Sequence, residues 1–157
     1  MLREMSDTLG PLAPDAWARA EQEAGGPLPL EYKRFLERFN GGSPTPSGFR
    51  IRWSGQEWAE RWSTDMVQQF LGIQEGSPAD LLSDVRVYRG RIPADTIPIG
   101  YDPGGNLLLL GVRGANTGKV FFWLQDYEIR EGGEPDYRNV GEVAPNLDAF
   151  LDSLFEP

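Results

Sequence analysis

The side chains that usually carry acid–base and metal chemistry are scarce in this sequence. Its 157 residues include no cysteine and no histidine. Thiolate zinc sites, cysteine nucleophiles and a Ser-His-Asp triad are therefore excluded, and catalysis would have to use Asp, Glu, Lys, Tyr, Ser or Thr. No linear spacing singles out a general acid and a nucleophile among the 24 acidic residues. We therefore expect a protein that is not an enzyme and that has no cofactor, no catalytic residues and no metal site.

Two glycine-containing segments approach known ligand loops but lack the residues that bind the ligand. Gly111–Val120 approaches the phosphate-binding pattern G-x-x-x-x-G-K-[ST], but Arg113 stands at the first glycine position and Val120 replaces the Ser or Thr. Asp102–Asn106 lacks the alternating oxygen ligands and the distal Glu of a calcium loop. Both segments are better interpreted as hairpin turns.

A cluster of tryptophans around residues 53–62 is the first candidate binding site. Trp is enriched among the residues that dominate protein–protein interfaces, and Arg61 and its acidic neighbours would supply a polar rim. The alternative is that these rings fill core volume. The candidate contacts in this segment are Trp58, Trp62, Glu57 and Glu60.

Charge is the second feature that suggests a binding surface. The formal net charge is −9, and acidic residues outnumber basic ones nine to two between Asp126 and Pro157. Such a surface either keeps the protein soluble or steers a basic protein partner. The candidate contacts in the Asp126–Asp136 segment are Asp126, Glu128 and Glu131.

Other classes of partner are not expected. The sequence has no Lys/Arg cluster, so direct nucleic-acid binding is not predicted. No apolar run approaches the ~20 residues needed to cross a bilayer. The first ten residues carry Glu4 and Asp7 and no apolar core, so they do not form a signal peptide, and a cytoplasmic location is expected.

Helical periodicity is clear in the first quarter of the chain. Ala13–Ala24 is predicted to be a helix that ends at Gly25-Gly26. Leu30–Asn40 is predicted to be a second helix, which Gly41-Gly42 ends with a left-handed stop. Its apolar residues follow the i, i+3, i+4, i+7 spacing of one helical stripe. They are Tyr32, Phe35, Leu36 and Phe39.

The middle of the chain is less regular. Phe49–Trp53 alternates apolar and cationic residues, as a half-buried strand does. Gln56–Gln69 could be a helix or an irregular excursion. Phe70–Ile73 is predicted to be a short strand and Pro78–Arg89 a helix.

The second half of the chain predicts a β-meander. Its three strands are Thr96–Tyr101, Asn106–Val112 and Lys119–Gln125, which short glycine-containing turns separate. Asn146 then caps a final amphipathic helix. The predicted fold is α+β: a single antiparallel, mostly meander β-sheet with helices packed on one face and at both chain ends. We expect one domain over residues 1–157, with its core at about 13–155.

Two motifs resemble those of the SUKH superfamily, which includes the yeast cell-wall assembly regulators and many bacterial immunity proteins. Leu28–Gly42 is similar to the family pattern LP-x-x-(Y/F)-x-x-F-L-x-x-x-N-G-G, and Ile97–Asn106 is similar to IPIG-x-D-x-G-G-(D/N). The resemblance spans about Ala13 to Phe155, whereas Thr45–Arg91 matches little. It implies the fold more strongly than it implies any function.

The resemblance implies a non-enzymatic protein-binding domain. Many family members are immunity proteins that bind and neutralise a toxin, often a nuclease. The expected function is therefore occlusion of a cognate toxin domain. Two alternatives remain open: a regulatory or scaffold protein without a toxin partner, and a carboxylate-based enzyme, which would need a deep pocket holding two or more close carboxylates.

Overall fold

The computed structural model describes all 157 residues, and its centre is a five-stranded antiparallel meander. The strands follow one another in chain order. They are β5 (Gln69–Phe70), β6 (Thr96–Tyr101), β7 (Leu107–Gly111), β8 (Val120–Trp123) and β9 (Val140–Ala144). The predicted meander is confirmed, and β9 is an additional strand that the sequence pattern did not indicate.

Two short ribbons extend this sheet at its edges, so the structure has three sheets where one was predicted. β1 (Glu4–Ser6) pairs with β2 (Ser43–Thr45), and β3 (Gly48–Arg50) pairs with β4 (Thr64–Met66). Single bridges join the ribbons to the meander, from Gly42 to Phe70 on β5 and from Arg52 to Glu142 on β9. Both outer strands of the meander therefore have their backbone groups partly paired rather than open to other chains.

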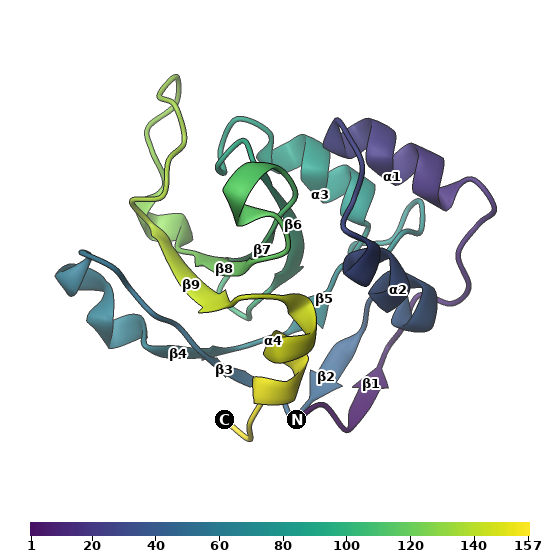
Figure 1. Cartoon of the computed structure of the whole chain (residues 1–157), viewed down its shortest axis with the longest axis horizontal. Coiled ribbons are helices and arrows are strands. Elements are labelled where there is room, and N and C mark those ends of the chain that lie inside the picture. Colours follow the sequence, from purple (N-terminus) through teal and green to yellow (C-terminus); the bar gives the residue numbers. More distant parts are fainter.

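Four helices cover one face of the meander (Figure 1). They are α1 (Ala16–Ala24), α2 (Leu30–Phe39), α3 (Leu81–Tyr88) and α4 (Leu147–Ser153). Their apolar stripes and alternate residues of the strands form a continuous core of 30 buried residues. The predicted cap of α4 is confirmed, because the Asn146 side chain accepts a hydrogen bond of 2.8 Å from the Ala149 N–H.

Loop residues and Tyr88, the last residue of α3, cover the opposite face. Leu109, Phe121 and Trp123 form a smaller cluster there. Tyr88 packs edge-on against Trp123 and Tyr137 edge-on against Phe121. The long connection between β8 and β9 thus supplies part of the core, which restricts where that connection can lie.

The end of α2 explains the Asn-Gly-Gly sequence. Asn40, not Gly41, is the first left-handed residue, with φ 50°. Its buried amide donates to the Gly10 carbonyl at 2.8 Å and accepts from the Ile73 N–H at 2.7 Å. Only Gly fits at position 72 beside it, because an added Cβ would lie 2.6 Å from the Asn40 carbonyl oxygen. Asn40 therefore joins three segments that are distant in the sequence.

Gln56–Gln69, for which the sequence allowed a helix or an irregular excursion, contains both kinds of structure. It forms a 3-10 helix, η1 (Glu57–Trp62), followed by β4. The strand predicted at Phe49–Trp53 is shorter in the structure. It begins at Gly48 and ends at Arg50. None of the helices has the length and apolar composition that crossing a bilayer requires.

Candidate functional site

The 3-10 geometry of η1 decides which of its side chains face solvent. With about three residues per turn, side chains at i and i+3 share a face, whereas those at i and i+4 do not. Ala59 is fully buried, Trp62 is half-buried, and Trp58 is 44% exposed. Trp62 is therefore turned toward the protein and Trp58 toward solvent, although their rings still meet edge-on with centroids 6.5 Å apart.

Tyr127 lies against both tryptophans. It ends a short 3-10 helix, η3 (Gln125–Tyr127), and its ring centroid is 4.4 Å from that of Trp58 and 5.6 Å from that of Trp62. The Arg61 guanidinium donates a hydrogen bond of 3.2 Å to the Tyr127 hydroxyl and lies 4.0 Å from the centroid of Trp62. The two candidate segments of the sequence are therefore one site in the structure.

A chain of aromatic contacts connects this site to the core. Trp53 packs edge-on against buried Phe122 of β8 and also contacts Trp58. The Trp53 indole N–H donates to the Trp62 carbonyl at 3.0 Å. The position of η1 is thus set by the sheet and not by local helix propensity.

A second connection joins the same two loops. The Gln56 side-chain amide donates to the carbonyls of Tyr137 and Val140, at 3.2 and 3.3 Å. In Figure 1 the two loops lie on the same side of the molecule, on the side opposite α1 and α3. Beside Trp58 and Tyr127 the two loops line an open groove of about 680 Å³. The loop between β3 and β4 and the connection between β8 and β9 therefore form one surface.

Exposed carboxylates lie close to the aromatic pair in the sequence. Glu57 and Glu60 are three residues apart, so they share one face of η1, and Asp126 directly precedes Tyr127. All three are exposed and form no ion pair. We call the set of Trp58, Tyr127, Glu57, Glu60 and Asp126 the aromatic–acidic surface.

The remaining predicted acids are placed differently. Glu128 forms a two-point ion pair with Arg91, at 2.9 and 3.1 Å, so its charge is already balanced within the protein. This pair holds the acidic loop to the segment after α3. Glu131 is exposed, unpaired and farther along the loop. Of these two acids, only Glu131 has a charge available to a partner.

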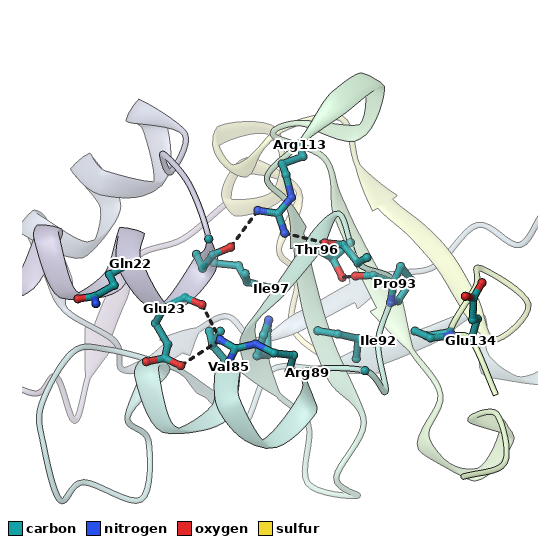
Figure 2. A pocket seen from close by; sticks show the side chains of 16 residues that line it. Gln22, Glu23, Val85, Arg89, Ile92, Pro93, Thr96, Ile97, Arg113 and Glu134 are labelled. Atoms are coloured by element: carbon teal, nitrogen blue, oxygen red, sulfur yellow. Dashed lines mark hydrogen bonds and ion pairs between the residues drawn. The ribbon is translucent and has the colours of Figure 1, made fainter. Parts of the chain in front are cut away.

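A second hollow lies elsewhere, and its charged side chains are paired within the protein (Figure 2). It has a volume of about 640 Å³ and lies between the ends of α1 and α3 and the start of β6. Arg113 crosses it, donating to the carbonyls of Ala24 and Ala94 at 2.9 and 2.7 Å. Glu23 pairs with both Arg86 and Arg89. Although burial acts in the opposite direction, hydrogen bonds from these arginines lower the pKa of Glu23.

The carboxyl pair that an enzyme would need is not located in a pocket. Asp65 of β4 lies beside Asp102, whose side chain accepts bonds from the N–H groups of Gly104 and Asn106. Burial and the hydrogen bond with Asp102 raise the pKa of Asp65 to about 7. Neither carboxyl lines any of the five main hollows. This carboxyl pair therefore does not face any of those hollows.

Tyr127 is the functional candidate that the sequence analysis missed. It stands between Asp126 and Glu128, both of which were chosen for their charge. An aromatic residue within an acidic, turn-rich segment is a usable signal, because such a ring has few apolar neighbours in the chain to bury it.

The fold and this surface define an α+β protein that presents aromatic and acidic groups on two loops, one from the β3–β4 ribbon and one from the meander. The chain matches the model of the SMI1 / KNR4 family (SUKH-1) over residues 11–153, and it belongs to that family. It is also similar to the SPbeta prophage-derived uncharacterized protein YokK of Bacillus subtilis (strain 168). The two are 25% identical over 146 residues, which cover 87% of this chain and 71% of YokK. The family consists broadly of immunity-type and regulatory domains that act through protein–protein contacts.

Proposed function

We propose that this protein is an immunity protein that neutralises a cognate toxin by covering it with the aromatic–acidic surface. The observation that carries the proposal is the exposure of Trp58 and Tyr127 in direct contact with one another, 44% and 40% exposed. Solvent-exposed Trp and Tyr packed together are typical of the centre of a protein interface. The proposed action is binding without catalysis, as one domain, in the cytoplasm.

The surrounding structure supports a binding role. A binding site benefits from side chains that are held in place before the partner arrives, because ordering them later costs affinity. Here Trp53 and Gln56 fix η1 through hydrogen bonds to Trp62, Tyr137 and Val140. Three unpaired carboxylates around the rings would attract a basic toxin domain and accelerate association.

Co-expression in bacteria tests the proposal. The toxin candidate to be tested is any large secreted protein found to be encoded beside this chain, expressed as its C-terminal domain. We expect growth arrest with the toxin alone, rescue with the wild-type chain, and loss of rescue with the Trp58→Ala/Tyr127→Ala variant. The matched control is Trp17→Ala, which removes a half-buried ring from α1 and should still rescue. Failure of the wild-type chain to rescue or to bind would defeat the proposal and favour a regulatory partner.

A further inference from the structure

We infer that the aromatic–acidic surface is specific for arginine: a protein partner places an arginine side chain on the exposed face formed by Trp58 and Tyr127. This inference deepens the proposed function, because it names the chemistry that the partner presents to that site. It begins from charge. The surface carries three exposed carboxylates, from Glu57, Glu60 and Asp126, against the guanidinium of Arg61. Arg138 also lines the groove beside the rings, but it is paired with Asp136, which lines the same groove. The surface therefore favours a cationic group and disfavours an acidic one.

The aromatic rings select among cationic groups, because they favour a guanidinium over an ammonium group. A guanidinium is planar and weakly hydrated, so it stacks on aromatic faces and still donates in its own plane. An ammonium is compact and strongly hydrated, and it gains less from a ring at an exposed site. Trp58 offers the best ring type for such a contact, and carboxylates of Glu57 and Asp126 lie next in sequence to the two rings.

The protein already contains one contact of this kind. Arg61 lies 4.0 Å from the centroid of Trp62 while donating to the Tyr127 hydroxyl. Trp62 is half-buried and its accessible face is occupied by this arginine, whereas no cation of the chain lies over Trp58. Trp58 is thus the exposed tryptophan of the cluster that has no cation over its ring.

Nucleic acid fits this surface less well. Bases also stack on exposed aromatic side chains, but such sites track the phosphates with Lys and Arg. Here the exposed charges on η1 and η3 are three carboxylates, those of Glu57, Glu60 and Asp126, against one guanidinium, that of Arg61, so the balance of charge repels phosphate. A protein segment that carries arginine satisfies both the rings and the charges.

Peptide titrations test the inference without the natural partner. The probes are an arginine-rich and a lysine-rich peptide of equal length and charge, with a single-stranded oligonucleotide as a third ligand. Calorimetry gives the affinities, and the indole N–H signals of the five tryptophans in NMR spectra report the location. We expect the arginine peptide to bind about 2- to 5-fold more tightly than the lysine peptide, with the Trp58 signal shifting and the Trp17 signal unchanged.

Variants separate stacking from charge. Trp58→Ala and, independently, Tyr127→Ala should make the two peptides bind equally, and this ratio is internally controlled even if a variant loses some stability. Glu57→Gln/Glu60→Gln should weaken both peptides and leave the ratio unchanged. Asp152→Asn, an exposed acid on α4, is the control for charge alone and should change neither ratio nor site.

Three results would overturn the inference: equal binding of both peptides to the wild-type chain, a preference that survives Trp58→Ala, or tighter binding of the oligonucleotide. The outcome is independent of the growth test. Arginine preference without toxin rescue would contradict the proposed function alone, and rescue without arginine preference would contradict this inference alone.

Discussion

The ring centroids of Trp58 and Tyr127 lie 4.4 Å apart, and the ring planes are inclined at 38°. Trp58 lies in the loop between β3 and β4, and Tyr127 lies in the loop between β8 and β9. Each loop would be poorly fixed alone, because each contributes short 3-10 turns and no long regular element. Contact between the rings stabilises both loops at once. Substitution of either ring should therefore lower the free energy of unfolding, and the coupling between the two substitutions can be measured.

Trp58→Ala and Tyr127→Ala are expected to be non-additive. Because each substitution removes the same ring contact, the double variant should lose less stability than the sum of the single variants, with a coupling of about 0.5–1 kcal/mol. Urea unfolding measures the four free energies. In the control cycle, Trp58→Ala is combined with Trp17→Ala, which shares no contact with it, and the effects should add. Additive effects in the first cycle would contradict the contact.

Substitution of Asn40 tests the joint between α2 and the meander. Asn40→Ala removes the acceptor for the Ile73 N–H and the donor to Gly10, and it places a Cβ residue at φ 50° without local compensation. We expect a loss of about 3 kcal/mol in the free energy of unfolding. Asn40→Gly, which tolerates positive φ, should lose about 1 kcal/mol less. Equal losses in both variants would show that backbone strain plays no part.

Ionisation of Asp65 is expected to destabilise the protein as pH rises. Its pKa is raised from 3.8 to about 7, so the folded state binds the proton more tightly than the unfolded state. The contribution is fully present below about pH 4 and is lost as pH rises to about 7. Asp65→Asn, which keeps the hydrogen-bonding shape without ionising, should be more stable than wild type at about pH 8, by about 1 kcal/mol after solvent screening.

The matching control is measured at about pH 4, where wild-type Asp65 is protonated and the two proteins should be equally stable. Thermal unfolding at both pH values gives the difference. A variant that is equally stable or less stable at the higher pH would show that the Asp65 carboxyl is not buried beside Asp102 in solution.

Tyr32→Phe is expected to be neutral or stabilising. Tyr32 lies on the buried face of α2, and its hydroxyl has no hydrogen-bond partner. Burial raises the pKa of Tyr32, in keeping with an environment that disfavours charge. Removal of an unpaired buried hydroxyl recovers its desolvation cost, about 1 kcal/mol or more. A measured loss above that size in urea unfolding would mean that the hydroxyl has a partner, such as an ordered water.

Much of the fold could be predicted because its elements follow simple periods. The apolar stripe of Tyr32, Phe35 and Leu36 is buried as predicted, and Thr96–Tyr101 forms a strand with the predicted limits. Asn146 caps the last helix. In each case local sequence and tertiary packing favour the same structure, so the pattern is sufficient.

The remaining elements depend on contacts that no local pattern encodes. β9 has the sequence VGEVA, in which Gly141 and Glu142 break the alternation, and it is a strand because β8 pairs with it. The strands β1 to β4 have three residues each and exist only as paired ribbons. Their pairing partners lie far away in the sequence, so their positions could not be read from periodicity.

The site was predicted by residue type but not by arrangement. The sequence did not decide between a helix and an irregular excursion for Gln56–Gln69. A 3-10 helix forms there, and the rings of Trp58 and Trp62 meet edge-on, with centroids 6.5 Å apart. Glu128 was chosen for its charge, yet Arg91 neutralises it. Tyr127 brings the two segments together, and its role follows from a contact between distant loops.

Amide hydrogen exchange of the complex with the cognate toxin domain tests the central claim most directly. The account predicts slower exchange in two segments, Glu57–Trp62 and Gln125–Glu131, with α1 and α2 unchanged. Protection confined to the helical face, with both segments exchanging as in the free protein, would contradict it.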